Sequence, residues 1–296
     1  MSNGVLLALL AYAVYSWSDA ATKALGGGLT VFEIGFFQTL IAGFFIYVAK
    51  PKEERWRAFW RMKRPLAVQT RALFGLAGSV LSVFAFTSIP LADVYAILFL
   101  SPLFVTVLSM VFLKEHVGPW RWFAVLAGFA GVLLVVRPGF RAVELGHLAA
   151  VAMAVLGAVA VILMRSLSNQ ERQTTMLGFV ILYGLAFNGA AMVFTTASLP
   201  TLSEAGILLF AGLCIAIGHV VILRATRFAP ANQLATTHYS QIVWAVAIGA
   251  IVFNEQPDAL SILGLAVIAG SGLLTVARER IRLGTVRWNP FSRNRL

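Results

Sequence analysis

Long apolar stretches constrain this chain more than any other feature. Ten of them have roughly the 20-residue length at which an α-helix crosses the hydrocarbon core of a bilayer. They cover residues 4–25, 29–49, 66–88, 91–113, 119–136, 146–165, 174–196, 202–224, 231–253 and 260–277. Inside a bilayer every backbone N–H and C=O must find a partner, and apolar runs this long without alternation predict helices. The sequence therefore predicts an all-α integral membrane protein with ten transmembrane helices.

The sequence also repeats itself. Residues 90–115 begin with proline and end with glutamate, and the same frame returns at 230–255, with Phe99 falling on Tyr239. A fixed offset over a long stretch predicts two related halves. We expect five-helix repeats at 1–140 and 141–282, followed by a basic tail at 283–296. Because five is an odd number, the second repeat is expected to be inverted in the membrane.

Positive charge is distributed unevenly along the chain. The formal net charge is +11 although only 12% of the residues are charged. With the N-terminus inside, every Lys and Arg except Lys23, Arg137 and Arg141 falls on the cytoplasmic side. Such a bias predicts cytoplasmic N- and C-termini. It also favours anionic membrane lipids over nucleic acid as the partner of the basic residues. We expect a multi-pass protein of a bacterial inner membrane.

Polar residues share one face of the first apolar stretch. Ser16, Asp19 and Lys23 are spaced three and four residues apart, which places them on one helix face. Asp19 precedes Lys23 by four residues, the favourable order for an intrahelical ion pair. The stripe predicts either a polar path or a structural pair near the outer end. Pro102 lies near the middle of residues 91–113, where it is expected to bend or break the helix. We assign structural or gating roles to Asp19, Lys23 and Pro102.

The remaining candidate residues are aromatic or polar side chains within apolar stretches, where such groups tend to face the interior of a bundle. The predicted substrate-binding residues are Ser16, Ser79, Tyr95, Phe99, His219, His238, Tyr239, Gln241 and Trp244. The sequence has no metal-binding signature and no nucleotide-binding loop. It also offers no nucleophile with an accompanying base. We therefore predict no catalytic residues, metal or cofactor.

Several motifs resemble the EamA-type carriers of the drug/metabolite transporter superfamily. They are Trp17 with Lys23, residues 91–115 with Pro102, GVLLVVRPG at 131–139, LRATRFAPA at 223–231, and Glu255. The resemblance covers most of the chain and implies ten helices and export of small metabolites, amino acids or drug-like compounds. Two positions depart from the pattern, since Gln38 replaces a basic residue and Ile242 replaces a proline. The family's charge preference for substrate is therefore not carried over.

Together these features predict a secondary transporter that exports amino acids or related amphipathic metabolites. We expect a central cavity between the two halves and alternating access. A multidrug or nucleoside exporter and a channel-like pore are the alternatives. Gly128 and Gly131 predict a packing surface, either between the halves or in a homodimer. Because Lys23 is a ready counter-ion for Asp19, the sequence favours facilitated diffusion or exchange over proton coupling.

Overall fold

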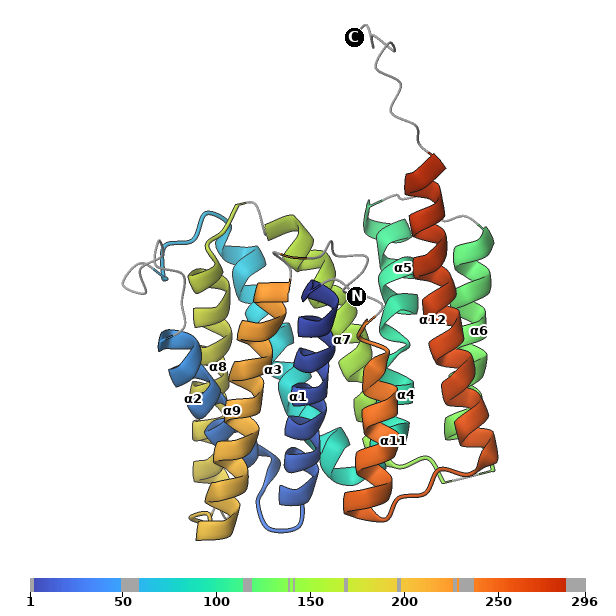
Figure 1. Ribbon diagram of the computed structural model, residues 1–296. Helices are drawn as coiled ribbons and strands as arrows, with labels where there is room; N and C mark the ends of the chain where they lie inside the picture. Colours follow the sequence, from blue (N-terminus) through green and yellow to red (C-terminus); the bar gives the residue numbers. More distant parts are fainter. Residues whose placement is uncertain are drawn as a thin grey trace, which may run out of the picture.

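The computed structural model is a bundle of helices (Figure 1). The structure describes residues 3–48, 59–113, 119–137, 139–140, 142–167, 170–195, 198–225, 228 and 237–285. In these ranges all regular structure is helical. The helices are α1 (Asn3–Leu25), α2 (Val31–Val48), α3 (Pro65–Ser88), α4 (Leu91–Leu98), α5 (Ser101–Leu113), α6 (Pro119–Val136), α7 (Leu145–Leu167), α8 (Gln173–Phe194), α9 (Leu202–Ala225), α11 (Ser240–Phe253) and α12 (Ala259–Thr285). Within the described residues, each of the ten apolar stretches contains a helix.

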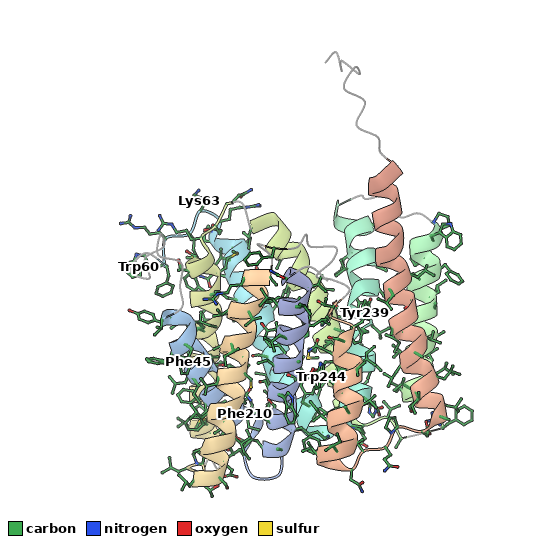
Figure 2. The ribbon with its side chains drawn as sticks, in the orientation of Figure 1. Phe45, Trp60, Lys63, Phe210, Tyr239 and Trp244 are labelled. Atoms are coloured by element: carbon green, nitrogen blue, oxygen red, sulfur yellow. The ribbon has the colours of Figure 1, made fainter. Side chains whose placement is uncertain are left out.

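The outside of the bundle is apolar, as a lipid environment requires. Five helices are long and apolar enough to cross a membrane by length and composition: α1, α2, α3 and the larger parts of α8 and α9. Shorter apolar helices accompany them along the rest of the chain. Large side chains such as Phe44 and Phe210 are exposed on the surface, and Figure 2 shows apolar side chains projecting outward along the helices. Apolar exposure on this scale is unusual in soluble proteins and expected in a bilayer.

The fourth predicted stretch is two helices instead of one bent helix. Residues 99 and 100 form a turn in which the Leu100 N–H bonds the Ile97 carbonyl at 2.9 Å. Pro102 then lies in the first turn of α5, where its missing N–H removes no intrahelical hydrogen bond. The predicted disruption is confirmed, but it begins before the proline. In the second half α11 likewise follows a turn at His238 and Tyr239.

Helices from the two halves of the chain pack against one another. α1 packs on α9, α3 on α7, α2 on α8, α4 on α11, and α6 on α12. The backbones of α6 and α12 approach closely, since a Cβ added to Gly131 would stand 2.7 Å from the Gly264 carbonyl oxygen. Gly128 faces Ser271 in the same interface. The predicted glycine surface is therefore used between the halves.

Two buried acids tie loops of one half to helices of the other. Glu33, in the first turn of α2, accepts hydrogen bonds from the backbone N–H groups of Thr30 at 2.7 Å and Ser198 at 2.8 Å. Glu171, just before α8, accepts from the N–H groups of Lys63 at 2.7 Å and Arg64 at 2.5 Å. Charge-assisted bonds to backbone donors are among the stronger hydrogen bonds in proteins. They fix both ends of the α2 and α8 side of the bundle.

Candidate functional site

A polar cluster joins three helices in the core. Tyr95 of α4 is 1% exposed. Its hydroxyl donates to the Asp19 carboxylate of α1. It also accepts a hydrogen bond from the Gln241 amide of α11 at 3.2 Å and lies 3.4 Å from the Ser16 hydroxyl. We call these four residues the tyrosine junction. The junction brings together three of the predicted binding residues and Asp19.

An aromatic cluster lies beside this junction. Phe99 stacks on Tyr239 with ring centroids 4.8 Å apart and an interplanar angle of 16°. The His238 ring lies 5.1 Å from Phe99 and 4.8 Å from Tyr12. Phe99 and Tyr239 lie in turns at matching positions of the two repeated stretches. Helix interruptions free backbone groups, which membrane proteins tolerate in the protein interior or along a water-filled path.

His219 of α9 lies apart from His238, with a tyrosine of its own. The Tyr15 hydroxyl is 3.0 Å from His219 Nδ1, and the two rings meet edge to face at 5.6 Å. His219 Nδ1 is also 3.0 Å from the Ile215 carbonyl of its own helix. The sequence reasoning did not select Tyr15. Its helical spacing from Ser16 and Asp19 gave no signal, because Tyr15 lies outside the polar stripe.

Three other predicted residues lie outside these clusters. Trp244 packs against the main apolar core. Ser79 is exposed and its hydroxyl bonds the Leu76 carbonyl one turn earlier at 2.8 Å, a common arrangement for a helical serine. The side chain of Pro102 is outside the described residues. Gln38, where a basic residue was expected, donates to the Thr22 hydroxyl at 2.8 Å and thus links α2 to α1.

The predicted ion pair between Asp19 and Lys23 is wrong. Lys23 pairs with Glu255 at 2.9 Å and donates to the Ile89 carbonyl at 2.7 Å. Glu255 also accepts from the Leu91 N–H at 3.0 Å. Helical spacing makes an i to i+4 pair available, but a long lysine side chain near a helix end also reaches neighbouring helices. Here the loop after α11 provides the carboxylate, and Lys23 links α1 to that loop and to the connection between α3 and α4.

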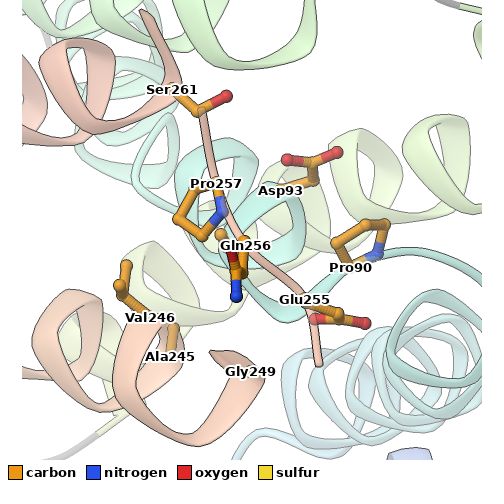
Figure 3. A pocket seen from close by; sticks show the side chains of 10 residues that line it. Pro90, Asp93, Ala245, Val246, Gly249, Glu255, Gln256, Pro257 and Ser261 are labelled. Carbon is orange, nitrogen blue, oxygen red and sulfur yellow. The ribbon is translucent and has the colours of Figure 1, made fainter. Parts of the chain in front are cut away.

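A cavity of about 150 Å³ lies beside this ion pair (Figure 3). It is formed by α4, by α11 and by the loop before α12, at the end of the bundle opposite the N-terminus of α1 (Figure 1). Its lining residues are Pro90, Ala92, Asp93, Ala245, Val246, Gly249, Glu255, Gln256, Pro257 and Ser261. Asp93 faces His147 of α7, with a carboxylate oxygen 3.6 Å from Nε2. Asp93 and His147 were not among the predicted site residues, because neither shares a helix face with other polar residues of the sequence.

The polar side chains of these clusters come from α1, α4, α9, and the start of α11 with the turn before it. Within the described residues, no group of three or more His, Cys, Asp or Glu side chains is arranged to hold a metal ion. The tyrosine junction offers a carboxylate, a phenol and an amide, and the histidine imidazoles lie nearby among aromatic rings. Such a set suits recognition of a ligand that has both apolar and polar parts.

Comparison with known proteins gives a family for the whole chain. The model of the EamA-like transporter family matches twice, at residues 2–137 and 144–277. The pseudopaline exporter CntI of Pseudomonas aeruginosa is 30% identical over 286 residues, covering 96% of this chain and 98% of the exporter. An S-adenosylmethionine uptake transporter of Rickettsia bellii is 25% identical and covers 94% of this chain and 95% of its own.

Two further comparisons extend this picture. A riboflavin transporter of Rhizobium johnstonii is 26% identical over 225 residues, covering 76% of this chain and 74% of the transporter. A solved crystal structure of a protein with 20% identity superposes with a TM-score of 0.67, covering 95% of this chain and 99% of the other. At that identity the likeness concerns the fold alone.

Proposed function

The chain belongs to the EamA-like transporter family, whose named relatives transport small molecules and are not enzymes, and we propose that it exports amino acids or related amphipathic metabolites by alternating access. The observation that carries this proposal is the aromatic cluster placed directly beside the tyrosine junction. Stacked rings provide an apolar surface, and the carboxylate and amide of the junction provide polar recognition. Amino acids with aromatic or aliphatic side chains combine both kinds of surface.

The packing of the helices supports two related halves, residues 1–140 and 141–282. In the two halves, α1, α2, α3 and α6 correspond to α7, α8, α9 and α12. When each helix is replaced by its counterpart, the contact of α1 with α9 becomes that of α7 with α3. The contact of α2 with α9 becomes that of α8 with α3, and the contacts of α2 with α8 and of α6 with α12 become themselves. A bundle with two-fold symmetry has this property. In Figure 1, α1 runs downward and α7 upward, which supports inversion of the second half.

The distribution of charge supports cytoplasmic termini in a bacterial inner membrane. The N-terminus of α1 and the C-terminal end of α12 lie at the same end of the bundle (Figure 1). Lys63 lies at that end too (Figure 2), and it belongs to the basic segment between α2 and α3. Basic residues concentrate on the cytoplasmic side of membrane proteins. Lys23 and Arg137, at the other end, are engaged in ion pairs.

The relatives leave open both the direction of transport and the class of substrate. One is named an exporter and another an uptake transporter. Purified protein in liposomes, with radiolabelled aromatic and aliphatic amino acids, nucleosides and cationic drugs as the panel, tests both substrate and mode. We expect saturable counterflow of amino acids. In inverted membrane vesicles, export should be measured as uptake of substrate into the vesicle. Flux that does not saturate contradicts the carrier and supports a pore.

Substitutions locate the site in the same assay. Phe99→Ala removes the stacking partner of Tyr239, and Gln241→Ala removes the amide from the tyrosine junction. We expect each to raise the half-saturating substrate concentration several-fold, since an aromatic contact contributes about 1 kcal/mol beyond its buried area and a hydrogen bond contributes about 1 kcal/mol. Gly270→Ala is the control, because a Cβ at that position meets no atom within 4 Å. Unchanged kinetics in both site variants, with the protein folded, would place the binding site elsewhere.

A further inference from the structure

Asp19 has its carboxyl group inside a membrane-spanning helix, and Lys23, the counter-ion expected from the sequence, is not paired with it. Lys23 is engaged with Glu255 and the Ile89 carbonyl. Among the residues that the structure describes, Asp19 receives one hydrogen bond, from the Tyr95 hydroxyl. An ionised carboxylate in a bilayer is expensive unless it is paired or accepts several hydrogen bonds. The environment of Asp19 therefore requires an explanation.

Other acids in this protein show how a carboxylate is normally held ionised. Glu33 accepts from two backbone N–H groups and from the Thr30 hydroxyl. Glu171 accepts from two backbone N–H groups. Glu255 has the ammonium of Lys23 and one backbone N–H. Each of these acids has at least two donors, or a cation and a donor, whereas Asp19 has a single phenol. Asp19 is the least compensated of the four.

Among the described residues, no cation replaces Lys23 as the partner of Asp19. α1 packs against α3, α9 and α11 and touches α4 through Tyr95. The described titratable groups on these elements and beside α11 are Arg71, Glu204, Cys214, His219, Arg224, Asp93, Tyr95, His238, Tyr239 and Glu255. Of these groups Tyr95 is hydrogen-bonded to Asp19. His219 is bonded to Tyr15, and His238 lies among the rings of Tyr12 and Phe99.

On this basis, and resting on the proposed export function, we propose that Asp19 binds and releases a proton during the transport cycle, so that substrate export is coupled to proton movement. When Asp19 is ionised, the charge-assisted bond from Tyr95 ties α1 to α4. Because Gln241 donates to the same phenol oxygen, the phenol hydrogen is available to Asp19. Protonation of Asp19 removes the charge and weakens this link between helices. The proton therefore acts where the substrate is proposed to bind.

Proton binding can be tested without a known substrate. Infrared spectra of the purified full-length protein, recorded between about pH 5 and pH 9, report the carbonyl stretch of protonated carboxyl groups. We expect a carboxylic-acid band that disappears as the pH is raised, is missing in Asp19→Asn and is retained in Glu33→Gln. The Glu33 variant is a matched control because it also removes a buried acid. Identical spectra of the wild-type protein and Asp19→Asn would overturn the proposal.

Coupling is tested in liposomes that contain a pH-sensitive dye. Addition of a transported amino acid should move protons in the wild-type protein and in Glu33→Gln, and Asp19→Asn should lose that movement. Amino-acid counterflow without proton movement in the wild-type protein would overturn the proton site and leave the export function standing. The opposite result, an Asp19 band in a protein that transports no amino acid of the panel, would overturn the export function and leave the proton site standing.

Discussion

Loss of charge at Glu255 should open the end of the bundle that lies opposite the chain termini. In the structure Glu255 joins Lys23 of α1 to the start of α4, and the two side chains are 21% and 13% exposed. A hydrogen bond between charged groups contributes about 1.5–3 kcal/mol when largely shielded from water. Glu255→Gln keeps the shape of the side chain and removes its charge. We expect a loss of about 2 kcal/mol, which corresponds to about a 30-fold shift between closed and open forms.

The assay is thiol labelling at a position that this ion pair protects. Ala245 lines the neighbouring cavity and is 1% exposed. In a Cys214→Ala background, Ala245→Cys should react slowly with a membrane-impermeant maleimide. Adding Glu255→Gln should accelerate the reaction about 30-fold if labelling follows the population of the open form. Asp258→Asn, which breaks a more exposed ion pair at the same end, is the control and should change the rate little. Equal rates with and without Glu255→Gln would refute this reasoning.

Two further predictions concern stability. Gly264→Ala places a Cβ 2.6 Å from the Gly131 carbonyl oxygen. We expect the free energy of unfolding, measured reversibly in mixed micelles, to fall by about 1–3 kcal/mol. Gly270→Ala should be neutral or stabilising, and equal stability of the two variants would contradict the close contact. The guanidinium of Arg137 holds the pKa of Asp258 below its ordinary value. A lowered folded-state pKa stabilises above the unfolded value of about 3.9 and loses its effect as the pH falls through the folded value. The stability difference between wild-type and Asp258→Asn protein should therefore be largest near neutral pH and shrink in acid; a difference independent of pH would contradict it.

The helices were predictable because a segment that spans the lipid must be a long and largely apolar helix. Apolar length alone located α1 and α9 within a residue or two, and the start and end of α6 were predicted correctly. Local spacing was a weaker guide to where helices break. Pro102 signalled an interruption, but the turn begins at Phe99, because a proline is accommodated in the first turn of the next helix. The end of α12 also differs, since this helix continues beyond residue 277.

The residues of the tyrosine junction were named from the sequence, but the pairing of Lys23 was not predictable; whether the junction binds substrate stays a prediction. Helical spacing put Ser16 and Asp19 on one face, and the structure brings both to Tyr95. Spacing within one helix carries no information about which distant residue lies opposite, and for that reason Lys23 was matched with the wrong acid. Glu255 was visible in the sequence only as the end of a repeated stretch. Its partner depends on how α1 and α11 pack, which periodicity does not determine.

The buried acids Glu33 and Glu171 have a consequence for how a carrier of this shape moves. Each accepts backbone hydrogen bonds from a loop of the opposite half, one at each end of the α2 and α8 side. By contrast, the side of the bundle that contains α1, α4 and α11 is joined at the Lys23 end by an ion pair between side chains. Bonds to backbone donors leave less freedom than those between long side chains. We therefore expect the α2 and α8 side to act as the hinge of the proposed carrier, with the motion occurring at α1, α4 and α11.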